Sequence, residues 1–308
     1  MLQETPLSHI MVSFIILNYN TSELAVSCVK SIKQHISGVD YEIIVVDNAS
    51  SREELESLRK GIGNKGKIVE MKWNTGFGLG NMMGANEAKG DYLCFINSDV
   101  VFTEDCVTPL VTYLNENPDV GCVTPQQYKP SGKQARSFKH NTGIRHKIFG
   151  DRLFEKLFPE KYPDRRKEHY GDPYTVPQLN GCFMLFPSDK FWKIGGFDTN
   201  VFLYHEEYDI GMRLKKEGWR CVVLPEFKFT HLGSATISKY KRKSYIEHRI
   251  SQMYAYRKHH NLFLSTIYKW ICLMGVVFNP KKWFLLKYMI RGEALSLSMR
   301  HKVSKQQN

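Results

Sequence analysis

Residues 11–20 read MVSFIILNYN, a continuous, partly β-branched apolar run that ends in three polar residues. Such a run is typical of a parallel strand that is buried on both faces. The pattern returns in residues 41–50 (YEIIVVDNAS) and 91–99 (DYLCFINSD), each closed by polar residues that include Asn and Asp. We therefore predict strands over residues 11–17, 41–46 and 91–96, with the loops after them at one carboxyl edge of a sheet.

Helical patterns separate these strands. Residues 21–35 place apolar side chains near helical spacing after a Thr-Ser N-cap, and residues 53–60 and 81–89 predict two more helices. A short strand over residues 67–71 completes an alternation of strands and helices. This order predicts an α/β fold with a doubly wound, mainly parallel sheet, in which ligands bind at the carboxyl ends of the strands.

The later part of the chain is less regular. Residues 178–186 and 220–224 predict strands, and residues 188–194 and 209–217 predict helices. Residues 126–177 are polar, basic and interrupted by prolines, with no sustained period. We expect a long loop excursion there, because a loop of this length inside a compact domain is usually functional or disordered.

The composition is that of a folded globular protein. Of 308 residues, 42% are hydrophobic and 24% are charged, which excludes collagen-like, disordered and disulfide-scaffold classes. The seven cysteines are odd in number and contain no C-x-x-C pair, so neither a disulfide framework nor a zinc knuckle is supported, and a reducing cytosol is expected. The first residues lack the basic region and cleavage site of a signal peptide.

The net charge of +12 is uneven, because residues 228–308 hold 16 basic and only 2 acidic side chains. A basic tail can meet nucleic acid, an anionic membrane or a phosphorylated substrate. Residues 262–278 are apolar but interrupted by Lys269, so they are too short to span a bilayer. Trp270 and Trp283, set among lysines, favour an interfacial segment on an anionic membrane. A helical pair that merely covers the core is the structural alternative.

Three polar clusters fall where the buried strands end: residues 18–20 (NYN), 47–48 (DN) and 97–99 (NSD). Each alone is ordinary turn chemistry, but three at one edge indicate a ligand site. A carboxylate such as Asp99 can hold a divalent cation together with substrate phosphates.

Residues 204–209 (YHEEYD) place three carboxylates at the start of a helix. The helix dipole favours acids there, which is the structural interpretation. Adjacent carboxylates in an apolar setting also raise one another's pKa, which suits a general base. His231 follows the last predicted strand; a lone histidine is more often a hydrogen-bonded structural residue.

Residues 74–81 (NTGFGLGN) are glycine-rich and precede a helix, as a phosphate loop does. The glycines alternate, so they do not form the dinucleotide fingerprint G-x-G-x-x-G. The chain also has no GK[ST] P-loop, no HExxH and no G-x-S-x-G. Kinase, dehydrogenase, zinc protease and α/β-hydrolase interpretations therefore lose their usual support.

Taken in order, residues 11–261 resemble the inverting nucleotide-sugar glycosyltransferases of family 2, which have the GT-A fold. The resemblance rests on VSFIILNYN, EIIVVDNASS, NTGFGLGNMMGANEAKGDYLCFINSDV, CFMLFPSDKFWKIGGFD, FLYHEEYDIGMRLKKEGWR and HLGS. It implies transfer of a sugar from a nucleoside-diphosphate donor to a hydroxyl group, with Mn²⁺ or Mg²⁺ as the cofactor.

The resemblance implies a role for each matched residue. The general base is Glu207, flanked by Glu206, and the metal ligands are Asp99 and His231. The nucleotide-binding residues are Asn18, Asn20, Asp47, Asn48, Asn74, Gly76, Asn97 and Ser98. The residues on the acceptor and donor side are Asn180, Gly181, Asp209 and Arg213. Two positions depart from the common family pattern, which often has Pro in place of Ser98 and Asp in place of Glu207.

Within the family the pattern most resembles rhamnosyltransferase-like enzymes of bacterial surface polysaccharide assembly. This implies a deoxythymidine-diphosphate-rhamnose donor, although uridine-diphosphate sugars fit the same residues, and a lipid-linked glycan acceptor. It also implies a catalytic domain over residues 1–261, a helical basic extension over residues 262–308, and a place on the inner face of a bacterial plasma membrane. Two other classes are a nucleic-acid-binding protein, against which the acidic edge residues argue, and a non-catalytic glycan-binding homologue, which the presence of Asp99, Glu207 and His231 disfavours.

Overall fold

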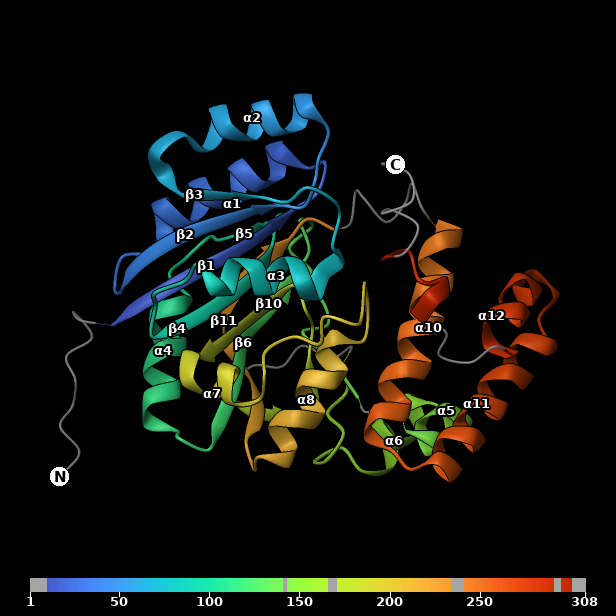
Figure 1. The fold of residues 1–308 in the computed structure, drawn as a ribbon. Helices are drawn as coiled ribbons and strands as arrows, with labels where there is room; N and C mark the ends of the chain where they lie inside the picture. The colour runs from blue at the N-terminus through green and yellow to red at the C-terminus, as the bar shows by residue number, and fades with distance from the viewer. Residues whose placement is uncertain (1–9, 141–142, 166–170, 234–240, 291–294, 301–308) are drawn as a thin grey trace.

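The computed structural model describes residues 10–140, 143–165, 171–233, 241–290 and 295–300. Figure 1 shows a curled sheet flanked by helices, with a second group of helices beside it. The strands of the sheet lie in the order β3 (Lys67–Glu70), β2 (Asp40–Asp47), β1 (Met11–Asn18), β4 (Tyr92–Asn97), β10 (Phe183–Pro187), β6 (Val120–Tyr128), β11 (Arg220–His231) and β5 (Val100–Val101), and β8 (Tyr174–Val176) pairs with β11.

The predicted α/β sheet is confirmed. Strands β3, β2, β1 and β4 are parallel to one another, and β6 is parallel to β11. Strand β10 runs antiparallel to both of its neighbours and so joins the two parallel parts into one mixed sheet.

Helices cover both faces of this sheet. One face packs against α1 (Ser22–His35), α2 (Arg52–Ile62) and α4 (Val107–Glu116), and the other against α3 (Gly76–Asn86), α7 (Ser188–Lys193) and α8 (Glu206–Lys216). Successive side chains of a strand point to opposite faces, so Phe14 and Ile16 enter the first layer while Ile15 enters the second. This explains why the strands of the sequence read as continuous apolar runs.

Four elements differ from their predicted bounds in ways that affect the site. The helix predicted over residues 209–217 begins at Glu206, and the strand predicted over residues 178–186 is divided into β9 (Gln178–Leu179) and β10. Helix α3 begins at Gly76, five residues before the predicted start. Strand β11 continues to His231, although the prediction ended at residue 224. The register of β11 against β6 shifts between Leu224 and Lys228, where Pro225 interrupts the pattern. Pairing with β5 then carries His231 alongside Val100.

Residues 126–177 contain more structure than the expected loop excursion. Strand β7 (Phe138–Lys139) pairs with β9 (Gln178–Leu179), and helices α5 (Ile144–Phe149) and α6 (Asp151–Leu157) follow it. Phe138 is buried against the second face of the sheet, and Ile144 packs on the C-terminal helices. This segment is therefore anchored at several points.

The C-terminal helices form a small core of their own. Helices α10 (Lys241–His259), α11 (Leu262–Val277) and α12 (Leu286–Ile290) enclose a buried cluster in which Tyr256 stacks on Tyr268 with ring centroids 3.8 Å apart. The predicted domain boundary at residue 261 thus lies between two helices that pack on each other. The remaining elements are the short 3-10 turns η2 (Gly63–Lys65), η3 (Pro280–Leu285) and η4 (Leu295–Leu297).

Candidate active site

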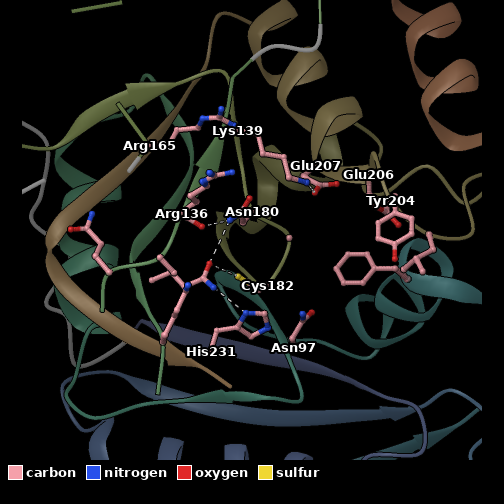
Figure 2. Close-up of a pocket in the computed structure, with 17 residues that line it drawn as sticks. Asn97, Arg136, Lys139, Arg165, Asn180, Cys182, Tyr204, Glu206, Glu207 and His231 are labelled. Carbon is pink, nitrogen blue, oxygen red and sulfur yellow. Dashed lines mark hydrogen bonds and ion pairs between the residues drawn. The ribbon is translucent and has the colours of Figure 1, made fainter. Parts of the chain in front are cut away.

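A cavity of about 690 Å³ opens where the ends of β4, β6 and β11 meet the first turn of α8. Figure 2 shows Lys139 meeting Glu207 at one end of it, and His231 with Asn97 at the other. The cavity is lined by Phe77, Asn97, Gln127, Lys129, Gln134, Ala135, Arg136, Lys139, Arg165, Asn180, Gly181, Cys182, Leu203, Tyr204, Glu206, Glu207 and His231.

The two predicted catalytic glutamates lie side by side in this cavity. Glu206 and Glu207 form the first turn of α8, and both are buried. The turn before them holds Tyr204 (φ 72°) and His205 (φ 66°) in the left-handed region, which is costly for residues other than glycine. Strain of this kind at the entry to a buried carboxylate pair is typical of a functional site.

The two carboxyl groups carry opposite pKa shifts. Burial, followed by the negative charge of Glu207, raises the pKa of Glu206 well above its usual value. Burial alone also favours the neutral form of Glu207, but the Lys139 ammonium 2.6 Å away outweighs it and lowers the pKa of Glu207 to about 2. At neutral pH the pair therefore holds one proton, on Glu206, and Glu207 is the carboxylate that can accept another.

The predicted metal ligands meet at the opposite end of the cavity. His231 Nε2 lies 3.0 Å from Asp99 Oδ1, yet this buried nitrogen makes no aligned hydrogen bond with any described residue. His231 Nδ1 lies 3.0 Å from the Gln127 side-chain amide. That amide can donate through its nitrogen or, when flipped by a half turn, accept through its oxygen, so it can form a hydrogen bond with either tautomer of the imidazole. Asp99 Oδ1 and the unbonded His231 Nε2 are thus close enough to be ligands of one cation.

This donor set fits a divalent cation that takes its remaining ligands from a substrate. Across the described ranges no group of three or more His, Cys, Asp or Glu side chains gathers as a metal site. Mg²⁺ and related hard cations are commonly held by one or two protein ligands and by substrate phosphates. Asp99 and His231 meet that requirement.

The polar residues at the strand ends are brought together as predicted. Asn18 pairs in register with Asp47, and its amide donates to the Asp47 carboxylate over 2.9 Å. Asn20 accepts from the backbone N–H of Ser51 over 2.8 Å. Ser98 Oγ lies 3.0 Å from Thr21 Oγ1 on the neighbouring loop. These contacts hold the loops after β1, β2 and β4 at one edge.

Asn48, Asn74 and Gly76 fix the start of α3. Asn48 accepts from the Thr75 N–H over 2.8 Å and donates to the Gly76 carbonyl over 3.0 Å, while Asn74 accepts from the Gly76 N–H over 2.9 Å. Gly76 has a φ of 82°, and a Cβ there would lie 2.1 Å from the carbonyl oxygen of Phe202. These hydrogen bonds within the loop explain why Asn, Asn and Gly stand at positions 48, 74 and 76. That the three residues bind a nucleotide stays a prediction.

The four residues predicted on the acceptor and donor side divide into two pairs. Asn180 and Gly181 line the cavity. Asp209 and Arg213 do not: they form an ion pair on the side of α8 that faces α10, where Asp209 also binds His259 over 2.7 Å. Helical spacing explains this, because residues two and six positions after Glu207 point away from it.

The sequence interpretation missed Lys139, Arg136 and Gln127. All three line the cavity, and Lys139 contacts Glu207 directly. Lys139 and Arg136 come from the part of residues 126–177 that has no periodic pattern, so no local signal distinguishes them from ordinary exposed cations.

Comparison with known proteins now decides the family. The model of Glycosyl transferase family 2 matches residues 13–195, more than half of the chain. The chain belongs to glycosyltransferase family 2. The expected enzyme class is thereby confirmed, and the family's matched region contains the strand-end clusters, Asp99 and Asn180.

Curated relatives are distant. The N-acetylglucosaminyl-diphospho-decaprenol L-rhamnosyltransferase of Mycobacterium tuberculosis is 28% identical over 204 residues, covering 61% of this chain and 66% of that protein. Polypeptide N-acetylgalactosaminyltransferase 3 of Drosophila melanogaster is 23% identical over 203 residues, covering 62% of this chain and 29% of that protein. The chain thus matches less than two thirds of the length of either relative.

Solved structures agree on the fold. The mannosyltransferase PcManGT of Pyrobaculum calidifontis, in complex with GDP-Man and Mn²⁺, superposes with a TM-score of 0.59 at 15% identity and covers 98% of this chain and 84% of that chain. GalNAc-T7 with UDP, GalNAc and Mn²⁺ gives a TM-score of 0.58 at 15% identity, covering 90% of this chain and 58% of that chain. The GT-A-like architecture is therefore confirmed.

The apolar helix α11 does not meet the requirements of a membrane span. Within the described ranges, no helix is both long enough and apolar enough to cross a bilayer.

Proposed function

We propose that this protein is a metal-dependent inverting glycosyltransferase that moves a sugar from a nucleoside-diphosphate donor to a hydroxyl group. One observation carries the proposal: a buried carboxylate that is ionised at neutral pH, Glu207, shares a cavity with His231, which faces Asp99. A base for the acceptor and a cation site for the leaving group are the two devices that direct displacement at an anomeric carbon requires.

In the proposed reaction, the acceptor oxygen forms a bond to the anomeric carbon while the bond from that carbon to the diphosphate oxygen breaks. The acceptor proton passes to the Glu207 carboxylate, and the electron pair of the broken bond leaves with the nucleoside diphosphate. A divalent cation held by Asp99 and His231 would act as a Lewis acid for that leaving group. Glu206 keeps its proton throughout and contributes no second negative charge.

The donor lies, in this proposal, along the edge formed by Asn18, Asn20 and Asp47, with its diphosphate towards Asp99. The name of the mycobacterial relative includes rhamnosyltransferase, which supports deoxythymidine-diphosphate-rhamnose as one donor. The alternative donors are uridine-diphosphate sugars, which fit the same side chains. The acceptor enters on the side of Asn180 and Gly181, next to Glu207.

We further propose that the C-terminal helices bind an anionic membrane surface. Helix α11 buries a stripe of Tyr268, Cys272 and Val276, yet its opposite side carries an exposed apolar stripe of Phe263, Trp270, Met274 and Val277, 72%, 59%, 44% and 41% exposed. A helix with apolar side chains on both faces needs a second apolar environment.

Exposed lysines follow in the next two elements, Lys281 in η3 and Lys287 in α12. An in-plane position on an anionic leaflet satisfies both features. It would place the enzyme on the cytoplasmic face of a bacterial plasma membrane, where a lipid-linked glycan acceptor is presented.

The reaction is tested with two variants and one control. Glu207→Gln should leave donor binding within about threefold of wild type while lowering turnover at least about a hundredfold, the usual contribution of a general base. Asp99→Ala should abolish metal-dependent turnover. Asp119→Asn removes an exposed carboxylate outside the cavity and should transfer normally. Full activity of Glu207→Gln would overturn the assignment of the base.

A further inference from the structure

The cation that faces the catalytic carboxylate comes from a different part of the chain. Lys139 ends β7, next to the buried Phe138, and pairing of β7 with β9 fixes its backbone. Its side chain is about half exposed, whereas that of Glu207 is only 10% exposed. The 2.6 Å contact between Lys139 Nζ and Glu207 Oε1 therefore joins a solvent-reachable ammonium to an enclosed carboxylate.

The other groups facing Glu207 do not supply this charge. Glu206 is neutral because burial and the charge of Glu207 raise its pKa, and burial lowers the pKa of His205 well below its usual value. Burial likewise lowers the pKa of His248, on α10, to about 4. Burial raises the pKa of Tyr204, so its hydroxyl is also neutral. Among the described residues around the pair, Lys139 is thus the group that is charged at neutral pH.

The other cationic side chains that line the cavity do not contact Glu207 among the described residues. Arg165 binds Asp151 and Glu155 on α6. Lys129 and Arg136 line the same cavity and contact no carboxylate in the described parts of the chain. Lys133 therefore offers a matched control, since it is an exposed lysine of the same segment that does not line the cavity.

Building on the proposed function, we propose that Lys139 is the positioning residue of the catalytic base: its ammonium fixes the Glu207 side chain in the cavity and keeps it ionised beside Glu206. Two adjacent buried carboxyl groups without a cation would compete for a proton, and the base would be partly lost to protonation at neutral pH. Lys139 prevents that loss. The cost is a weaker affinity of Glu207 for the acceptor proton, because an ion-paired carboxylate is a poorer base.

The pH dependence of kcat/KM tests this role. At saturating Mn²⁺, which suppresses proton competition at the metal ligands, Glu207 should give wild type no acidic limb between about pH 5 and pH 8, because it stays ionised throughout. Lys139→Gln should acquire an acidic limb inside that window and lose roughly tenfold in kcat at neutral pH. Lys139→Arg should restore most of the wild-type pH profile and most of the kcat, because it restores a cation beside Glu207. Lys133→Gln, outside the cavity, should keep the wild-type pH profile.

An unchanged acidic limb in Lys139→Gln, with folding verified by thermal unfolding, would overturn the proposal. A second readout separates positioning from direct contact with the donor. Donor affinity, measured by calorimetry in the Glu207→Gln background, should not change when Lys139→Gln is added; a further loss of affinity there would make Lys139 a donor ligand instead. Failure of the proposed function is distinct, since it would appear as full activity in Glu207→Gln alone.

Discussion

Asp209 provides the sharpest test of the packing between the catalytic helix and the C-terminal helices. Its side chain is 1% exposed, and its two oxygens bind basic side chains from both sides: Arg213 of α8 over 2.5 Å, and Lys258 and His259 of α10 over 2.7 Å each. Asp209→Asn keeps the shape of the side chain but removes the charge. Arg213 and Lys258 then remain beside a neutral amide.

The expected loss follows from this geometry. Removing one partner of a buried ion pair costs about 3–5 kcal/mol, because the other charge stays desolvated. Lys258 retains a second partner in Asp198, 2.8 Å away, so the lower end applies. About 3 kcal/mol corresponds to a drop in Tm of roughly 5 °C for a chain of 308 residues, because the unfolding entropy is about 2.1 cal/mol/K per residue.

The pH dependence has a definite sign. Burial raises the pKa of Asp209, but the hydrogen bond from His259 and the charges of Arg213 and Lys258 outweigh it and hold the pKa far below the usual range. A depressed pKa stabilises the fold above the unfolded-state value of about 3.9, and the contribution disappears as pH falls. The difference between wild type and Asp209→Asn should therefore shrink as pH is lowered from about 5 to about 3.

Urea unfolding followed by circular dichroism measures both effects. The matched control is Asp119→Asn, whose carboxylate pairs with Arg220 at the surface, 56% and 38% exposed, and should change the free energy of unfolding by less than about 1 kcal/mol. A loss in Asp209→Asn no larger than that of the control would refute the view that this cluster joins α8 to α10.

Three further predictions concern other parts of the molecule. Glu206→Gln should lose less than about tenfold in kcat, because Glu206 is already protonated and a neutral amide replaces a neutral acid. Glu207→Gln should lose at least about a hundredfold, because it removes the ionised base. Equal losses in steady-state assays would contradict the assignment of Glu207 alone as the base. Gly76→Ala should destabilise the fold by at least about 2 kcal/mol, since its Cβ would meet a backbone oxygen at 2.1 Å in a left-handed conformation, and thermal unfolding at the wild-type Tm would show that the loop adapts. Trp270→Ser should weaken binding to vesicles with anionic lipid several-fold, whereas Trp192→Ser, an exposed tryptophan on α7, should not; equal binding by both would count against the membrane surface.

The sheet could be predicted from the sequence because each strand is marked by its own residues. The runs ending at Asn18, Asp47 and Asn97 are buried on both faces, so they read as continuous apolar strands whatever surrounds them. Their polar ends meet because parallel neighbours share one carboxyl edge. The register of Asn18 with Asp47 is the direct outcome.

Other parts of the site depend on contacts between distant segments. His231 reaches Asp99 only because β11 continues beyond Pro225 and pairs with β5, which no periodicity indicates. Lys139 reaches Glu207 through the two-residue pairing of β7 with β9. Asp209 lies outside the cavity for another reason. It is close to Glu207 in sequence, but two residues along a helix its side chain points to a different face.

Metal-dependent nucleotide binding at Asp99 and His231 is tested by calorimetric titration of UDP, dTDP and GDP into the protein, with and without Mn²⁺, for wild type and Asp99→Asn. We expect at least one of these nucleotides to bind, with an affinity that rises at least about tenfold with Mn²⁺ in wild type and loses that gain in the variant. Nucleotide binding that is equal with and without Mn²⁺ in both proteins would contradict the cation site formed by Asp99 and His231. No nucleotide binding at all, alongside tight binding of DNA or RNA, would contradict the glycosyltransfer mechanism itself.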